Sequence, residues 1–427
     1  MRGRWTRLVG RPRGNSAEAV PVGHAPSSVS PVPGAPTRGN TGRAFRIAIL
    51  AAASIRLVIA SSTFGTNDAL IWTQLADLIN ENGLVDVYAL TPYMNHPPLP
   101  ALYMAGARAW ATSVEIPFAF ALKLPALVGD GLSATAIYLA QRSATNVQRA
   151  RRSVMWFLFN PAVIALSAFH GNTDSFYAGL IALAVTLLWR RPATAGLLVA
   201  AALNIKLLPL VLVPAVLVAM PTSGRRRFAG GLTVGIVPFV ALAAIAPWSV
   251  ERILGYSPVR ETWGLAGLAR IHPDLQSFSD SATIHGRWLL AVATIVVAVT
   301  VWKRGVSPAR AALMAHVAFL VVMPGFGIQY FALLIPLGML VRVRHQAWLV
   351  ASASAFVVVL YVTKLQDFWP ANAVYDDPIP VVAAIFGYIA WAVMVWFVFA
   401  GWSEPPSRQR RPLSEFDADH TGAPALT

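Results

Sequence analysis

Long apolar segments alternate with short polar ones along almost the whole chain. Many of the apolar segments reach about 18 residues, which is long enough for a helix to cross a bilayer. A transmembrane β-barrel would instead show alternating segments of roughly ten residues. The pattern therefore predicts an all-α polytopic membrane protein. The apolar segments fall at about 45–63, 117–140, 153–169, 174–189, 193–220, 228–247, 286–302, 310–325, 328–341, 346–363 and 379–401.

Basic residues lie between these segments and indicate the cytoplasmic loops, because Lys and Arg are in excess on that side. Placing every basic cluster inside requires 193–220 to cross twice, hinged near Asn204 and Lys206. It also requires 99–112 to be a juxtamembrane helix on the outer face. About twelve spans then result, with both termini in the cytoplasm. The basic clusters are Arg2 to Arg46, Arg142/Arg149/Arg151/Arg152, Arg190/Arg191, Arg225–Arg227, Lys303/Arg304/Arg310, Arg342/Arg344 and Arg408/Arg410/Arg411. The outer segments are 64–116, 169–174, 248–285 and 364–378.

The composition agrees with a membrane protein. The chain is 56% hydrophobic and 12% charged, where soluble proteins carry about 25% charged residues. The net charge of +15 is spread between apolar segments rather than along one soluble face, so nucleic-acid binding is not expected. The chain has no cysteine, which excludes disulfides, thiolate zinc sites and iron–sulfur clusters.

The two ends of the chain differ from its middle. Residues 1–43 are rich in Pro, Gly, Ser and Arg and have no apolar core, so they are not a cleavable signal peptide. Their composition predicts a disordered basic cytoplasmic tail, and 403–427 have a similar composition. Residues 44–402 are predicted to form the transmembrane domain.

The first aspartate of the chain, Asp68, follows the first apolar segment. The outer loop that it begins is predicted to be helical, because Ile71, Leu75 and Leu78 share one face. Two interpretations of Asp68 stay open. Asn67 or Asp68 caps the helix, or Asp68 is a general base at the membrane boundary, with a pKa raised by partial desolvation.

A second polar cluster ends the segment FNPAVIALSAFHGNTDS at 159–175, where His170, Asn172 and Asp174 lie close together. One interpretation is a solvated turn in which Asp174 caps the following helix. The other is a turn that enters a cavity and faces the same site as Asp68, since polar groups between apolar spans are costly against lipid.

Charged residues also occur within the apolar segments. Lys123 is expected to extend toward the outer interface. Asp130 lies deeper, and an intramembrane carboxylate normally has a partner or lines a cavity. Arg56 and Lys206 are the candidate partners for a buried anion, and purely structural pairing remains an alternative for both.

The outer segment 248–285 interleaves arginines with aromatic residues, among them Arg260 and Trp263. Guanidinium groups there could hold a phosphate through paired hydrogen bonds, although aromatic residues are also common at membrane interfaces. In PGFGIQY at 324–330, Gln329 and Tyr330 could hydrogen-bond a polar ligand, or the segment is a tight interhelical turn. The sequence contains no P-loop, HExxH or GxSxG motif.

The order of these motifs resembles the GT-C superfamily of integral membrane glycosyltransferases. The nearest resemblance is to bacterial relatives of the mannosyltransferases of GPI-anchor synthesis, which use polyprenyl-phosphate mannose. It covers residues 45–345, and the chain departs from the family in having Asn172 where Gln is usual and His before the PPL sequence. The motifs are an external Asp after the first span, Tyr88/Tyr93, HPPL at 96–99, LKLPALVGDGLSATAIYL at 122–139, FNPAVIALSAFHGNTDS at 159–175, NIKLLPLVLVP at 204–214 and GIQYFALLIPL at 327–337.

The resemblance implies an extracytoplasmic, inverting transfer of mannose or another hexose from a polyprenyl-phosphate donor. The acceptor would be a lipid, glycan or protein, and Asp68 would be the general base. The resemblance leaves open whether a divalent metal ion assists. Besides the donor, the acceptor and membrane lipids, no partner is implied. The expected substrate-binding residues are Asn67, Tyr93, His96, Lys123, Asp130, His170, Asn172, Asp174, Lys206, Arg260, Trp263, Gln329 and Tyr330.

Two alternatives to an enzyme stay open. A transporter or lipid flippase should show inverted repeats and paired broken helices, and only 193–220 has such a break. An inactive scaffold with the same fold is the other alternative. The concentration of polar residues at the outer boundary favours an enzyme.

Overall fold

The computed structural model describes residues 38–255, 263–270, 272–343, 345–364 and 379–403. Nearly all of the tail predicted at 1–43 and of the tail predicted at 403–427 lies outside these ranges. The chain divides into two compact units, Met1–Ala44 and Phe45–Thr427. Of the first unit the structure describes only the start of helix α1 (Arg38–Ser62), and the other described elements belong to the second.

Every regular element among the described residues is helical, which confirms the predicted all-α class. After α1, the first half of the chain forms α2 (Asn67–Asn82), α3 (Val87–Leu90), α4 (Pro98–Ser113), α5 (Phe118–Ala144), α6 (Val147–Leu158), α7 (Pro161–Ile164), η1 (Ala165–Phe169), α8 (Asp174–Leu187), α9 (Pro192–Leu203), η2 (Leu208–Leu212) and α10 (Val213–Ala219). The second half forms α11 (Thr222–Gly235), α12 (Val237–Ile245), α13 (Pro247–Gly255), η3 (Ala266–Arg270), η4 (Pro273–Leu275), α14 (Gln276–Arg304), α15 (Pro308–Val322), η5 (Ile328–Tyr330), α16 (Phe331–Leu340), α17 (Gln346–Thr363) and α19 (Val381–Ser403).

The chain is a multi-pass helical membrane protein. Within the described ranges, five helices are long and apolar enough to cross a bilayer, or seven if two bent pairs each count as one span. Shorter apolar helices of 10–17 residues occupy most of the other predicted segments. Large apolar side chains such as Leu50, Val292 and Phe399 are exposed on the helices, as expected for surfaces that face lipid. A total of about twelve spans is compatible with this arrangement and stays a prediction.

Two helix features on which the predicted topology depends are present. Segment 193–220 is broken between α9 and η2, where the side-chain amide of Asn204 donates to the carbonyls of Ala200 (2.8 Å) and Gly235 (2.9 Å). The stretch 99–112 lies within the separate helix α4, which packs against α2 and is not among the candidate spans. The side of the membrane on which α4 lies stays a prediction.

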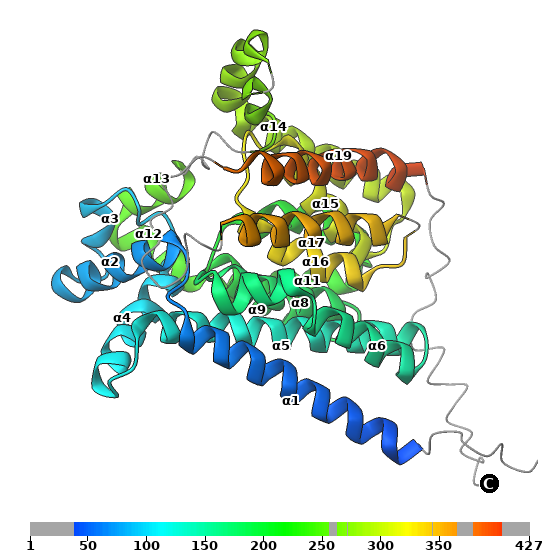
Figure 1. Ribbon diagram of the computed structural model, residues 1–427. Coiled ribbons are helices and arrows are strands. Elements are labelled where there is room, and N and C mark those ends of the chain that lie inside the picture. Colours follow the sequence, from blue (N-terminus) through cyan, green and yellow to red (C-terminus); the bar gives the residue numbers. More distant parts are fainter. Residues whose placement is uncertain (1–37, 256–262, 271, 344, 365–378, 404–427) are drawn as a thin grey trace, which may run out of the picture. The chain divides into compact units, whose positions relative to one another are not determined.

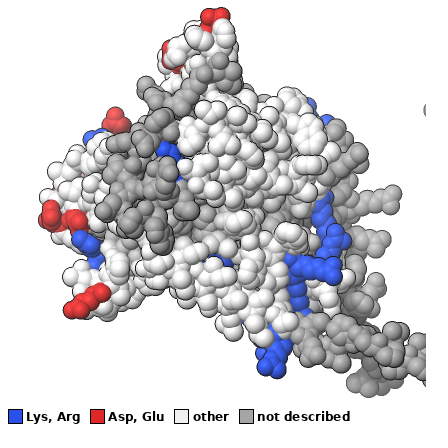
Figure 2. All heavy atoms as spheres, in the orientation of Figure 1, with Lys and Arg blue, Asp and Glu red and all other residues white. Residues whose placement is uncertain are grey.

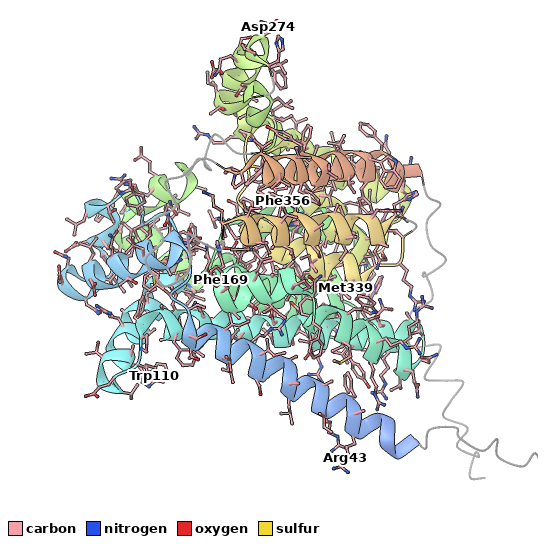
Figure 3. All side chains as sticks on the ribbon, viewed as in Figure 1. Arg43, Trp110, Phe169, Asp274, Met339 and Phe356 are labelled. Carbon is pink, nitrogen blue, oxygen red and sulfur yellow. The ribbon has the colours of Figure 1, made fainter. Side chains whose placement is uncertain are left out.

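Helices α5 and α8 pack at very short range, and this contact positions the start of α8. A Cβ atom at Gly129 of α5 would lie 2.0 Å from the carbonyl oxygen of Ser175, so only glycine fits there. Phe356 lies on α17 (Figure 3). It packs edge-on against Trp263 and Phe331 in one hydrophobic core. The helices that carry the site are therefore held by tight packing.

The two ends of the second unit differ in charge. Helices α2, α3 and α13 lie together at one end, where α13 packs on α3 (Figure 1). Lys and Arg side chains gather at the other end, where α5 ends and α6 begins (Figure 2). Helix α2, which begins with Asn67 and Asp68, lies at the end away from this basic cluster (Figure 1). The turns that follow α1, η1 and α9 carry or adjoin six of the predicted site residues: Asn67, Asp68, His170, Asn172, Asp174 and Lys206.

Candidate active site

Asp68 lies in the first turn of α2, with its carboxylate directed at the turn after η1. Its Oδ2 atom is 3.1 Å from Nε2 of His170 and accepts a hydrogen bond from the side-chain amide of Asn172. The N-cap of α2 is Thr66, whose hydroxyl accepts from the backbone N–H of Asp68 at 3.4 Å. The capping interpretation of Asn67 or Asp68 is therefore wrong, and the carboxylate of Asp68 is left to face the turn.

The turn that meets Asp68 is buried, so its interpretation as a solvated turn is also wrong. His170, Asn172 and Asp174 are each at most 5% exposed. The backbone enters through the π-helical turn η1, whose wider spacing lets the N–H of His170 donate to the carbonyl of Ala165. Gly171 then adopts φ +80, and a Cβ atom there would lie 2.9 Å from that of Ala69 in α2. This backbone path brings the turn directly against α2.

A second contact fixes the same two loops to each other. The backbone N–H and the hydroxyl of Thr66 both donate to the carbonyl of His170, at 3.1 and 2.9 Å. The distance between Asp68 and His170 is therefore set by backbone geometry as well as by their side chains. Such double fixation keeps a reacting group within the narrow range of positions that catalysis requires.

The ring of His170 also contacts α17. The Tyr361 hydroxyl lies 2.6 Å from Nδ1 of His170, and Phe169 packs edge-on against the Tyr361 ring. Nε2–H of the imidazole donates to the Asp68 carboxylate, which can only accept, while Nδ1 faces the Tyr361 hydroxyl. Tyr361, His170 and Asp68 thus form a continuous hydrogen-bonded chain.

Lys206 lies in the break between α9 and η2 and brings positive charge to the site. Its ammonium group is 2.8 Å from Oδ1 of Asp174, 4.6 Å from the ring centre of Tyr330 and 5.8 Å from that of Tyr177. Two aromatic faces and a carboxylate hold the cation in place. Lys206 therefore pairs with the buried carboxylate of Asp174, and Asp174 is an ion-pair partner rather than the residue that caps α8.

The pKa of the Asp68 carboxyl is lowered, whereas the sequence predicted that it is raised. Burial alone raises the pKa of its carboxyl, but the hydrogen bonds and charge of His170, the Asn172 amide and the charge of Lys206 outweigh burial and lower that pKa below its usual range. The prediction of a raised pKa is wrong, because it considered desolvation without these partners. Asp68 is consequently ionised at neutral pH.

His96 stands beside this group on the loop between α3 and α4. Its ring packs edge-on against Trp72 of α2, and its carbonyl accepts from the Tyr88 hydroxyl at 2.8 Å. Burial, reinforced by the charge of Lys206 and opposed by that of Asp68, lowers the pKa of His96 to about 3, so its ring is neutral. A backbone hydrogen bond from Leu99 to Asn204 (3.0 Å) ties the HPPL loop to the break that carries Lys206.

Two of the expected binding residues have structural partners away from Asp68. Lys123 is fully buried and donates to the carbonyl and the hydroxyl of Thr63, the residue that follows α1. Its expected place near the outer interface stays a prediction. Asp130 pairs with Arg56 at 2.7 Å and accepts from Ser167 of η1 at 2.6 Å. Arg56 is thus the partner of the buried Asp130 carboxylate, and this group joins α1, α5 and η1.

The other expected residues are dispersed. Tyr93 is 59% exposed, and Asn67 and Gln329 are half-buried. Trp263 is buried against the Phe326 and Phe356 rings. Arg260 lies outside the described residues. The structure therefore gathers one cluster from the expected set: Asp68, His96, His170, Asn172, Asp174, Lys206 and Tyr330.

Tyr361 is the site residue that the sequence did not indicate. It lies near the end of an apolar helix, 191 positions after His170. An interfacial tyrosine in such a place is ordinary, so only the three-dimensional contact identifies it.

The gathered residues combine the hydrogen-bonded carboxylate of Asp68 with the Lys206 cation, which lies within its electrostatic range. An ionised carboxylate can accept a proton, and an ammonium group can stabilise an anion that develops beside it. In the part of the chain that the structure describes, no three His, Cys, Asp or Glu residues are arranged so that they could hold a metal ion. Instead, Asp68 faces the imidazole of His170, and Asp174 faces the ammonium group of Lys206.

Comparison with known proteins gives a similarity in fold. No protein-family model matches the chain, and none of the curated proteins matches it. Among solved structures, the chain is similar to ArnT from Cupriavidus metallidurans in the apo state, with a TM-score of 0.48 and 15% sequence identity. The alignment covers 84% of this chain and 71% of that one. Similarity at this level leaves the function to be argued from the site residues.

Proposed function

We propose that the protein is a membrane glycosyltransferase that moves a sugar from a polyprenyl-phosphate donor to an acceptor hydroxyl. The observation that carries the proposal is the cluster in which His170 and Asn172 hold the Asp68 carboxylate within the electrostatic range of the Lys206 cation. A general base next to a binding group for an anionic leaving group is what this transfer requires. The resemblance in motif order to GT-C enzymes supports the class of donor.

The proposed reaction is a single displacement. The acceptor oxygen attacks the anomeric carbon while its proton passes to Asp68, and the bond from that carbon to the phosphate oxygen breaks. The polyprenyl phosphate leaves with the bonding electron pair, and Lys206 stabilises its charge. Attack from the face opposite the leaving group inverts the anomeric configuration. Mannose is the first sugar to test, followed by other hexoses.

His170 and Asn172 have a positioning role in this proposal. Their hydrogen bonds fix the Asp68 carboxylate in one orientation and keep it ionised, at the cost of a weaker base. A fixed carboxylate loses less conformational freedom when the acceptor hydroxyl binds. Orientation and ionisation together offset the lower basicity.

The proposed location is the extracytoplasmic side of the cell membrane. The site lies at the end of the second unit away from the basic cluster at α5 and α6, and the positive-inside rule assigns that basic end to the cytoplasm. In this proposal 44–402 is the transferase domain, and 1–43 and 403–427 are cytoplasmic tails.

Because the chain has no cysteine, the variant Gln148→Cys tests the orientation directly. It should resist membrane-impermeant thiol reagents in intact cells, and ready labelling would contradict the topology.

The activity test compares purified wild-type protein with Asp68→Asn, using radiolabelled polyprenyl-phosphate sugars and an extract of membrane lipids as acceptors. The substitution should lower transfer by at least about a hundredfold, as expected when a general base is lost. Asp77→Asn is the matched control, because Asp77 lies on the same helix and pairs with Arg108 away from the site. Parallel assays with EDTA show whether a divalent metal ion assists.

The results distinguish the proposal from its alternatives. Unchanged transfer in folded Asp68→Asn would remove Asp68 as the base. Vectorial movement of lipid-linked sugar without transfer, measured in proteoliposomes, would favour a transporter or flippase. A folded protein with neither activity would be a scaffold.

A further inference from the structure

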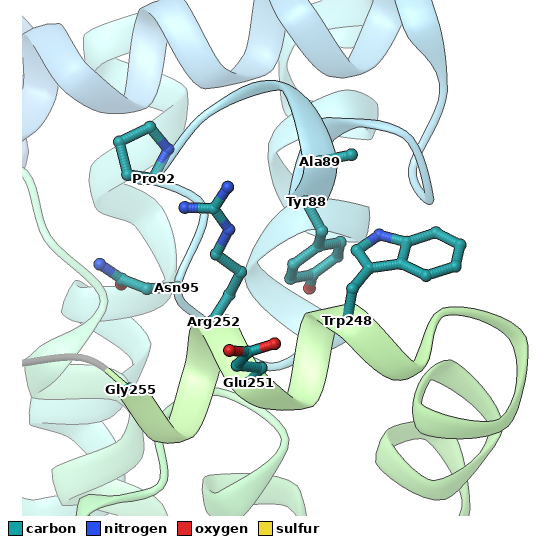
Figure 4. A pocket seen from close by; sticks show the side chains of 8 residues that line it. All are labelled: Tyr88, Ala89, Pro92, Asn95, Trp248, Glu251, Arg252 and Gly255. Carbon is teal, nitrogen blue, oxygen red and sulfur yellow. The ribbon is translucent and has the colours of Figure 1, made fainter.

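A pocket of about 670 Å³ opens between α13 and the chain around α3 (Figure 4). Trp248, Glu251 and Arg252 line it from α13, and Tyr88 and Asn95 line it from the opposite side. Figure 4 shows Trp248 and Arg252 rising from the helix toward this opposite wall. The proposed reaction assigns no role to these side chains.

The charged groups of this pocket are available to a ligand. Glu251 and Arg252 are both exposed, and within the described ranges neither forms a hydrogen bond or an ion pair. The guanidinium group offers several donors and the carboxylate only acceptors, while the Asn95 amide supplies both. The lining therefore has hydrogen-bonding capacity of both kinds and no net charge.

The aromatic side of the pocket favours a ligand that has an apolar face. Trp248 is 44% exposed, so a large part of its indole remains uncovered. An exposed aromatic face can bury the apolar face of a ligand while polar groups at its rim bind the rest. A sugar ring matches this lining, because it has C–H groups on its faces and hydroxyl groups around its edge. A phosphate matches poorly, because Glu251 repels it.

The pocket is adjacent to the proposed catalytic cluster. Asn95 is the residue before His96, and the hydroxyl of Tyr88 donates to the carbonyl of His96 at 2.8 Å. His96 in turn lies within the electrostatic range of Asp68 and Lys206. The loop that carries Asn95 and His96 therefore connects the pocket with the surroundings of the Asp68 carboxylate.

We propose that this pocket binds a sugar residue of the acceptor, which makes the acceptor a glycan or a glycosylated lipid. The inference rests on the proposed transfer reaction and specifies the class of acceptor. Trp248 would contact the ring face, and Glu251, Arg252 and Asn95 would bind the hydroxyl groups. Binding there would leave another hydroxyl of the same glycan free to reach Asp68.

The test measures binding of methyl glycosides of mannose, glucose, galactose and arabinose to the full chain in lipid nanodiscs by saturation-transfer NMR. Trp248→Ala should weaken binding of the preferred glycoside about fivefold, as expected for one aromatic contact. Glu251→Gln and Arg252→Gln, which change hydrogen bonding without removing packing, should also weaken it. Trp288→Ala is the matched control, because Trp288 is an exposed tryptophan of α14 that does not line the pocket.

Each outcome bears on the proposal. Binding that the three pocket variants leave unchanged would overturn it, as would binding of inorganic phosphate that displaces every glycoside. Asp68→Asn should retain glycoside binding while losing transfer, and this separates the pocket from the reaction. If wild-type protein transfers no sugar but binds a glycoside through Trp248, the proposed function fails and the sugar site stands. With an active enzyme, Trp248→Ala should raise the KM for the acceptor and leave the KM for the donor unchanged.

Discussion

The hydroxyl of Tyr361 lies 2.6 Å from Nδ1 of His170, and the other nitrogen of that ring faces Asp68 at 3.1 Å. A residue near the end of α17 is thereby connected to a carboxylate in α2 through one imidazole. The connection fixes the orientation of the His170 ring, as an outer hydrogen-bond partner does at many catalytic sites. If Asp68 is the base, Tyr361 influences the reaction without touching a substrate.

The first prediction concerns Tyr361→Phe. The variant keeps the ring contact with Phe169 but loses the hydrogen bond to Nδ1 of His170, so the imidazole is oriented by fewer partners. We expect kcat to fall about tenfold, within the range for groups that support general base catalysis, with little change in the KM for the donor. Tyr138→Phe is the control, since Tyr138 lies in α5 and stacks on Phe45. Unchanged kcat in Tyr361→Phe would contradict a positioning role.

The second prediction separates two roles of Lys206. If the ammonium group stabilises the departing phosphate, Lys206→Gln should lower kcat/KM by about a hundredfold or more. The same variant also leaves Asp174 without its ion-pair partner. The double variant Lys206→Gln/Asp174→Asn removes that unpaired charge, so it should recover stability but not activity. Recovered activity in the double variant would show that Lys206 only neutralises Asp174.

The third prediction is a pH profile. Because its hydrogen bonds lower the pKa of Asp68, the base stays ionised through weakly acidic conditions, and the transfer rate should change little from pH 8 to about pH 5. The native interactions of Asp68 stabilise the fold above the unfolded pKa of the carboxyl and are lost as the pH falls through the lowered folded pKa. His96 stays neutral over the same interval, since its pKa is about 3. A loss of rate centred near pH 6 that is absent in Asp68→Asn would contradict the lowered pKa.

The fourth prediction tests whether Asp130 serves structure or substrate. Arg56→Met leaves the buried Asp130 carboxylate without its ion partner and should destabilise the protein by about 3–5 kcal/mol. Arg56→Met/Asp130→Asn removes the charge and keeps a group that can bond Ser167, so the apparent melting temperature should largely recover. Arg142→Met, at an exposed arginine of the same helix as Asp130, is the control. If the double variant is stable and still inactive, Asp130 belongs to the site.

The sequence anticipated the contact between the two polar turns but not the way in which it forms. Assigning the basic clusters to one side placed Asp68 and the 170–175 turn on the other, and the structure brings them together. The N-cap role of Thr66 and the π-helical turn before His170 depend on a hydrogen-bond register that residue types do not specify. The pKa of Asp68 was mispredicted for a related reason, because burial is visible in an apolar sequence whereas hydrogen-bond partners are not.

The partners of the charged residues within apolar segments were only partly predictable. The cost of an isolated charge in the membrane requires partners for Arg56 and Lys206, but it does not say which anion pairs with which cation. Lys123 shows the limit most clearly, because it satisfies its charge with the carbonyl and hydroxyl of Thr63 at the end of α1 and with no acidic residue among those described. Backbone acceptors of this kind leave no signal in the sequence.

The π-helical turn η1 makes the direction of His170 depend on the length of the chain as well as on the identity of its residues. A regular α-helix advances by roughly 100° per residue, so a chain shorter by one residue between Ala165 and Phe169 could close this turn into an ordinary α-helical one. His170 would then point to a different side of the helix, away from both Asp68 and Tyr361. Among proteins that share this fold, the presence of the extra residue would therefore separate those that can build the hydrogen-bonded chain from those that keep the same helices without it.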